Sequence, residues 1–219
     1  MGTMAELFKN TVVVALLGVV VGAVLTGGFT LLNAWVMRNR DLNLKLWERF
    51  LDHRITAHET VVSLALKMRF MCPLGKVDRG EVIRAPQVMM SKEAFNDWFA
   101  EFSKSSGPAT TWLSTPVKRE LNFVQDYFVT LHTNLSEASS EHFATVGSFI
   151  RQDFIDLSSS LEKTAFEFFK TEARELRLNN LTEHHKYPRE ETVRRLQKTV
   201  LLGRWKEIQG MIQSGQAPT

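Results

Sequence analysis

The 219-residue sequence contains a single cysteine, Cys72, and this scarcity removes several classes of protein. No internal disulfide can form, which argues against a small secreted scaffold and agrees with a reducing compartment. No cysteine pair is available to hold a structural zinc, and no His-Glu-x-x-His run provides a catalytic metal site. The sequence therefore predicts neither a metal nor a cofactor. Cys72 itself, next to Pro73, is more typical of a small buried hydrophobic residue than of a nucleophile.

Signatures of nucleotide-binding and hydrolytic enzymes are also missing. The chain has no Gly-rich phosphate loop, no Gly-x-Gly-x-x-Gly after a strand and no Gly-x-Ser-x-Gly elbow. Its 6 prolines and 12 glycines form no rich tract, and no long internal repeat is visible. These absences favour a protein that is not an enzyme.

Charge is missing from one long segment. Residues 11–37 contain no Asp, Glu, Lys, Arg or His over 27 consecutive positions. As a helix the segment is ~40 Å long at ~1.5 Å per residue, against a hydrocarbon core of ~30 Å. A cleaved signal peptide is the alternative, but its apolar core would be about 7–15 residues and would precede a small-x-small cleavage site. We therefore expect an N-terminal single transmembrane helix that spans the lipid bilayer.

Small side chains recur at every fourth position of this segment. They are Gly18, Gly22, Thr26, Thr30 and Ala34. Because lipid supplies little hydrophobic drive for helix association, small residues promote it by letting backbones approach closely. We expect this stripe to be the contact of a homo-oligomer, although small residues are also generally common in membrane helices. Asn33 lies about 100° from the stripe and is the expected pore-lining residue if the assembly encloses a channel.

The flanks of the segment predict its orientation. Only Lys9 precedes it, whereas four basic residues follow closely, namely Arg38, Arg40, Lys45 and Arg49. The positive-inside rule then places the chain in the inner (plasma) membrane with its carboxyl side in the cytoplasm. Trp35, Arg38 and Arg40 are the expected membrane-interface residues, and the net charge of +3 suits an anionic surface. The opposite orientation, with a periplasmic or extracellular domain, stays open.

The rest of the chain has the three- and four-residue apolar spacing of helices. Helices are predicted over residues 41–71, 91–103, 115–135, 141–178 and 188–213. We expect Gly107-Pro108 to break the chain and residues 77–90 to be a loop with a short strand pair. The predicted fold class is all-α, with the transmembrane helix continuing into a cytoplasmic helical bundle. The expected parts are a tail at 1–10, the transmembrane helix at 11–37, a juxtamembrane helical extension at 38–71 and the bundle at 72–219.

Two residues at a predicted helix junction could perform acid–base chemistry. Arg177 and His184 are separated by six residues. If they meet, the histidine could move the proton of a ribose 2′-hydroxyl while the guanidinium holds the phosphate. Arg54 and His58 form a similar pair, so such spacings also arise by chance. The structural alternative is a helix-terminal arginine with solvent-facing histidines.

At these residues the chain resembles the HEPN class of prokaryotic ribonucleases and their inactive relatives. Its single membrane helix joined to a helical bundle is similar to the accessory membrane protein of RNA-targeting type VI-B CRISPR systems. The resemblance covers the architecture and the Arg-x(4–6)-His pattern at Arg177 and His184. It implies an oligomeric membrane assembly, which could be a pore, acting in antiviral defence with a protein partner of that system.

RNA is a further partner to weigh, because basic residues surround this motif. They are Arg174, Arg177, Lys186, Arg189, Arg194, Arg195, Lys198, Arg204 and Lys206. Glutamates lie among them and interleaved exposed aromatics are lacking, so a solvated mixed-charge face is the expected interpretation. Three functions follow from the sequence. The leading one is a self-associating, non-enzymatic membrane assembly. The others are a membrane-tethered ribonuclease using Arg177 and His184, and a membrane-anchored adaptor.

Overall fold

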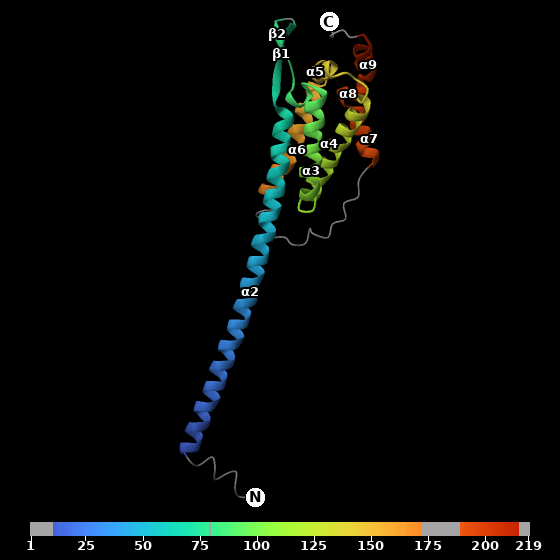
Figure 1. The fold of residues 1–219 in the computed structure, drawn as a ribbon. Coiled ribbons are helices and arrows are strands. Elements are labelled where there is room, and N and C mark those ends of the chain that lie inside the picture. Colours follow the sequence, from blue (N-terminus) through green and yellow to red (C-terminus); the bar gives the residue numbers. More distant parts are fainter. Residues whose placement is uncertain (1–10, 79, 172–188, 215–219) are drawn as a thin grey trace. The chain divides into compact units, whose positions relative to one another are not determined.

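The computed structural model describes residues 11–78, 80–171 and 189–214 (Figure 1). The chain divides into two units, Met1–Leu51 and Asp52–Thr219. The long helix α2 (Thr11–Arg69) contributes residues to both units. The mostly helical fold expected from the sequence is confirmed for the described residues.

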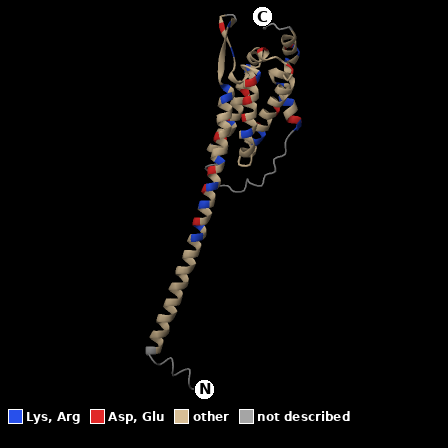
Figure 2. Ribbon diagram, in the orientation of Figure 1, with Lys and Arg blue, Asp and Glu red and all other residues tan. Residues whose placement is uncertain are grey.

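The first unit consists, in its described part, of the amino-terminal portion of α2. Every residue from 14 to 38 is exposed to the surroundings of the chain. In Figure 2 the first turns of α2 carry neither acidic nor basic colour, and in the sequence the charged residues of this helix begin at Arg38. A helix satisfies its backbone hydrogen bonds internally, which is the requirement for a segment placed in lipid. By length and composition, this helix could cross a membrane.

The second unit begins with the last turns of α2 and a β-hairpin. Strand β1 (Met71–Asp78) pairs antiparallel with β2 (Glu81–Pro86). Gly80 in the turn has φ +86°, and Gly75 has φ +68° where the register shifts between Pro73 and Val77. Both are left-handed conformations that favour glycine. A short 3₁₀ turn, η1 (Gln87–Met89), follows the hairpin.

Seven further helices of the described residues complete this unit. They are α3 (Lys92–Thr110), α4 (Thr115–Asn134), α5 (Ser140–Phe149), α6 (Arg151–Lys170), α7 (Arg189–Gln197), α8 (Val200–Gly203) and α9 (Trp205–Ser214). Helix α4 packs against α3 and α6, and α5 packs against β2 and α9. The core between them is largely aromatic. Its largest fully buried members include Phe95, Phe102, Tyr127, Phe128 and Phe154.

Gly147 of α5 marks a close approach between the helix and the hairpin end. A Cβ atom built on Gly147 would lie 2.6 Å from Cβ of Met89 and 3.5 Å from Cβ of Ala85. Only a residue without a side chain fits there without a shift of its neighbours. Helix α5 therefore packs closely against the end of β2 and against η1, with no side chain of its own at Gly147.

The predicted break at Gly107-Pro108 is wrong, since α3 continues through both residues to Thr110. Proline inside a helix removes one backbone hydrogen bond and costs stability. Here Ala109 packs the last turn into the core, and within the helix the Thr110 hydroxyl donates to the Ser106 carbonyl at 2.7 Å. Helix α4 starts at Thr115 as predicted, with Ser114 as its N-cap.

Two helices predicted as continuous are interrupted. The segment expected at 141–178 is divided at Ile150, whose φ of −93° and ψ of 13° leave the helical region, and α6 ends at Lys170. The segment expected at 188–213 is divided into α7, α8 and α9. At the first of these divisions, the Thr199 side chain caps α8 by accepting from the Leu202 N–H.

The helix expected at 41–71 ends at Arg69, and its buried face starts later than the spacing indicated. Leu44 is 50% exposed, and within the described chain the first fully packed residues are Ala57 and His58. The strand pair expected within 77–90 also starts earlier, at Met71.

Candidate functional site

The small-residue stripe of α2 is open along its described length. A Cβ atom built on Gly18 or Gly22 meets no atom within 4 Å. The Thr26 hydroxyl donates to the Gly22 carbonyl, and the Thr30 hydroxyl donates to the Thr26 carbonyl, each at 2.7 Å. These two side chains therefore present methyl groups outward while their hydroxyl protons are satisfied within the helix. Such a surface suits close packing in lipid.

The stripe winds around the helix instead of running straight. On a helix of 3.6 residues per turn, each four-residue step advances by about 40°, so Gly18 and Ala34 face directions about 160° apart. A neighbouring helix contacts successive small residues near the crossing point and then separates from the axis. The two ends of the stripe therefore face nearly opposite sides of the helix.

The other expected membrane residues are also exposed. Trp35 is 64% exposed, and Arg38 and Arg40 both lie on the surface of α2. Asn33 is exposed as well. An amide in this position requires either another polar group or water, because an unsatisfied polar group in hydrocarbon is costly. Asn33 is the one carboxamide side chain in the segment 11–37.

Comparison with protein-family models, curated proteins and solved structures found no match to this chain.

Arg177 and His184 lie outside the described residues. The second arginine–histidine pair, Arg54 and His58, is fully described. His58 is completely buried, and its ring stacks on Phe168 with centroids 3.7 Å apart. The Arg54 guanidinium lies over the same Phe168 ring, 4.6 Å from its centroid.

The hydrogen bonds of His58 define its protonation state. Nδ1 lies 2.7 Å from the Arg54 carbonyl oxygen, which can only accept, so this nitrogen carries a proton. The Ser114 backbone N–H donates to Nε2 at 3.3 Å, so that nitrogen is an acceptor. The pKa of His58 is lowered from 6.5 to about 4, chiefly by burial; the hydrogen bond to the Arg54 carbonyl opposes this shift and the nearby Arg54 charge adds to it. His58 is thus a neutral residue that joins α2 to the start of α4, closed to external substrate.

A second buried polar centre joins α4, α6 and α8. The Asp153 carboxylate accepts three hydrogen bonds: from the Tyr127 hydroxyl at 3.0 Å, the Val200 N–H at 2.8 Å and the Leu201 N–H at 2.9 Å. Burial raises the pKa of Asp153, while the two backbone donors oppose that rise. Burial also raises the pKa of Tyr127. The arrangement caps α8 with a carboxylate from another helix, a role that sequence spacing could not show.

An ion pair lies beside this centre. The Arg195 guanidinium donates to both carboxylate oxygens of Glu120, at 2.7 and 2.9 Å, and its carbon lies 3.7 Å above the Phe123 ring. These residues line a surface hollow of about 270 Å³ together with Asp153. Glu120 is 8% exposed, whereas the Arg195 side chain is 34% exposed, so only the carboxylate side of the pair is removed from water. Arg204 is similarly paired with Glu207.

These pairs bear on the two ligand classes considered from the sequence. Two of the basic residues that could attract RNA, Arg195 and Arg204, already have carboxylate partners and stack on aromatic rings. Within the described residues no group of three or more His, Cys, Asp or Glu side chains is arranged to hold a metal ion.

Proposed function

We propose that this chain is a single-span membrane protein whose copies associate through the small-residue stripe into an oligomeric assembly, without catalysing a reaction. The observation that carries the proposal is the combination of a 27-residue charge-free helix with an unoccupied stripe of small residues. Gly18, Gly22, Thr26, Thr30 and Ala34 provide close backbone approach, the main route to helix association in lipid.

The winding of the stripe supports a ring. A closed ring with cyclic symmetry requires each copy to offer two different surfaces, one to each neighbour. Gly18 and Gly22 can face one neighbour while Thr30 and Ala34 face the other. Asn33 points about 60° from Gly18 and about 100° from Ala34, between the directions of the two neighbours, and is the residue we assign to a lumen if the ring conducts. A use in antiviral defence, beside a protein partner, rests on the resemblance described above.

The test is the oligomeric state of the full chain in a neutral detergent, measured by size-exclusion chromatography with light scattering. We expect a discrete oligomer for the parent and a shift toward monomer for Gly22→Leu, which fills the contact surface. Gly28→Leu is the matched control, because Gly28 is equally open and lies about 120° around the helix from Gly22. It should leave the oligomer intact.

Two results would contradict self-association through the stripe: a monomeric parent, or a Gly22→Leu variant with the same mass as the parent. The channel is tested separately by dye release from liposomes. Asn33→Leu should reduce release while the oligomer persists. Equal release from the parent and from Asn33→Leu would remove Asn33 from the lumen, and no release from the parent would remove the channel.

A further inference from the structure

A basic face follows the charge-free portion of α2. The face consists of Arg38, Lys45 and Arg49. Lys45 comes seven positions after Arg38, and Arg49 four positions after Lys45, which places the three within an arc of about 40° on the helix. All three side chains are exposed. The fourth basic residue of the segment 38–51, Arg40, lies about 160° away from Arg38, on the opposite side of the helix.

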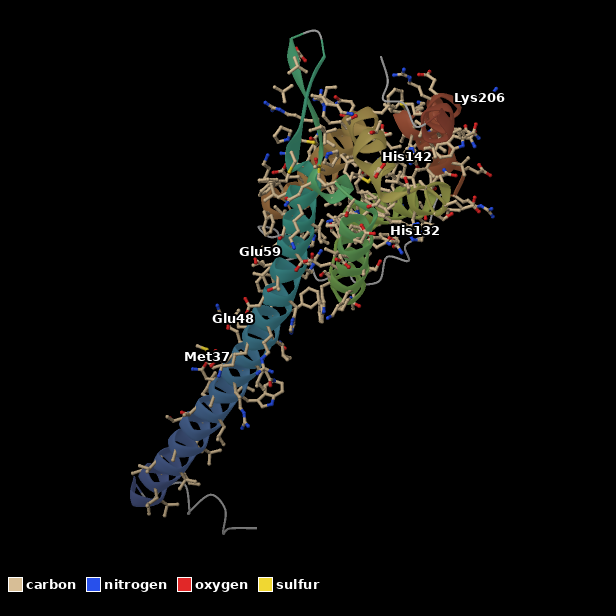
Figure 3. The ribbon with its side chains drawn as sticks, turned by 45° about the horizontal axis from the view of Figure 1, so that its top comes forward. Met37, Glu48, Glu59, His132, His142 and Lys206 are labelled. Atoms are coloured by element: carbon tan, nitrogen blue, oxygen red, sulfur yellow. The ribbon has the colours of Figure 1, made fainter. Side chains whose placement is uncertain are left out.

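The acidic residues of the same segment lie to one side of the basic face. Asp41 is about 60° and Glu48 about 80° from the direction of Arg38. Figure 3 shows Glu48 on the same side of α2 as Met37. Three- and four-residue spacing from Lys45 would allow ion pairs with both acids. The ion pairs found among the described residues all lie in the second unit, and none involves the basic face.

We propose that the face formed by Arg38, Lys45 and Arg49 binds the phosphate head groups of anionic phospholipids. The inference rests on the membrane span of the proposed function. Arg38 directly follows the charge-free segment 11–37. Lys45 and Arg49 lie ~10 and ~16 Å further along the helix axis. The head-group layer is about 5–8 Å thick on each side, and charges act over about one Debye length of ~10 Å beyond it. All three positive charges therefore lie within range of the lipid phosphates.

The length of the apolar segment brings one face of the helix closer to the surface. Its ~40 Å exceeds the ~30 Å hydrocarbon core, and a helix accommodates such a surplus mainly by tilting. Tilting lowers one side of the helix end toward the head groups. The side with three long basic side chains gains the most, because Lys and Arg can extend along apolar surface and keep their charge at the phosphates. Trp35 lies about 60° from this side and suits the same boundary.

Lipid is favoured over RNA as the source of the phosphates. Proteins that bind single-stranded nucleic acid interleave basic residues with aromatic side chains on which bases stack. The arc that contains Arg38, Lys45 and Arg49 has no aromatic residue between positions 38 and 49. The apolar segment also delivers this face directly to a bilayer surface.

The experiment measures lipid binding to the full chain in a neutral detergent by native mass spectrometry, with POPG and POPC as probes. Each basic residue near an anionic surface strengthens binding by about fivefold, so three give a preference of roughly a hundredfold for POPG at low ionic strength. Replacing all three (Arg38→Gln, Lys45→Gln and Arg49→Gln) should reduce the preference to fivefold or less. The matched control replaces three exposed basic residues of the second unit, Lys76→Gln, Arg84→Gln and Lys104→Gln, and should keep it.

The proposal is overturned if the triple variant keeps the POPG preference, if the parent shows none, or if the control loses it equally. It is also overturned if a short RNA oligonucleotide binds the parent and displaces POPG, and the triple variant binds neither the RNA nor POPG. Two other measurements, carbonate washing of membranes and the oligomeric state, show whether the proposed function fails. A chain released from membranes by carbonate washing has no span, and a chain that stays in membranes as a monomer has a span without self-association. The lipid preference is measured on the Gly22→Leu variant as well, since it requires no oligomer.

Discussion

Acidification from pH 7 to pH 5 should destabilise the second unit through His58. The folded chain holds the pKa of this buried ring at about 4, while in the unfolded chain it returns to about 6.5. Between these values the unfolded state binds a proton that the folded state does not, so stability falls as the pH falls. The full difference corresponds to about 3 kcal/mol, of which about 2 kcal/mol is lost between pH 7 and pH 5.

The assay is thermal unfolding of the full chain in a neutral detergent, followed by near-ultraviolet circular dichroism. A loss of about 2 kcal/mol corresponds to a decrease in Tm of about 4–8 °C for a domain of this size. His58→Phe can still stack on Phe168 but cannot take up a proton. The decrease in Tm between pH 7 and pH 5 should therefore be smaller in this variant by about 4–8 °C. His132→Gln, which replaces an exposed histidine, should keep the slope of the parent (Figure 3).

The reasoning is refuted if the parent and His58→Phe show the same pH slope. Asp153 acts in the opposite direction. Burial raises the pKa of Asp153 in the folded state, so the folded chain binds the proton more readily than the unfolded chain. Taken alone, this group makes the stability increase as the pH falls toward the pKa of Asp153 in the unfolded chain. The comparison with His58→Phe isolates the histidine, because Asp153 is unchanged in both proteins.

Two further substitutions test the packing of the same unit by their Tm. Asp153→Ala leaves the buried Tyr127 hydroxyl and the backbone donors of α8 without an acceptor and should cost about 2–5 kcal/mol, whereas Asp156→Ala on the exposed side of α6 should change stability by less than about 0.5 kcal/mol. Equal effects of the two would contradict the assigned cap. Gly147→Ala forces a Cβ against Met89 and should cost about 1–3 kcal/mol, whereas Gly107→Ala meets open space and should be neutral or slightly stabilising. A Gly147→Ala protein as stable as the parent would show that the hairpin can move away from α5.

Helices were predictable because their signal is local. The three- and four-residue spacing of apolar side chains gave the positions of most helices, and the absence of charge from residues 11–37 gave the exposed part of α2. The interruptions were not predictable in the same way. Both Phe149 and Ile150 fit the apolar pattern at that point, and this change of phase is where α5 ends and α6 begins. A phase ambiguity of that kind is the local signal that could have identified the break.

The buried polar residues could not be found from spacing, because their partners are remote. His58 meets Ser114, and Asp153 meets the backbone of Val200 and Leu201, across 47 to 56 positions of sequence. Their environment depends on helices that the sequence places only approximately. The stripe of α2 is different, since its members lie on one helix and helix geometry gives their directions without tertiary information.

The hydroxyl groups of Thr26 and Thr30 have a consequence for the order of events in a membrane. Because each donates its proton to a carbonyl of the preceding turn, neither of these two hydroxyls enters hydrocarbon without an acceptor. Insertion of these two side chains then requires no second chain, and the proposed association is a later equilibrium governed by the number of copies per unit area of bilayer. Expression level would set the fraction assembled.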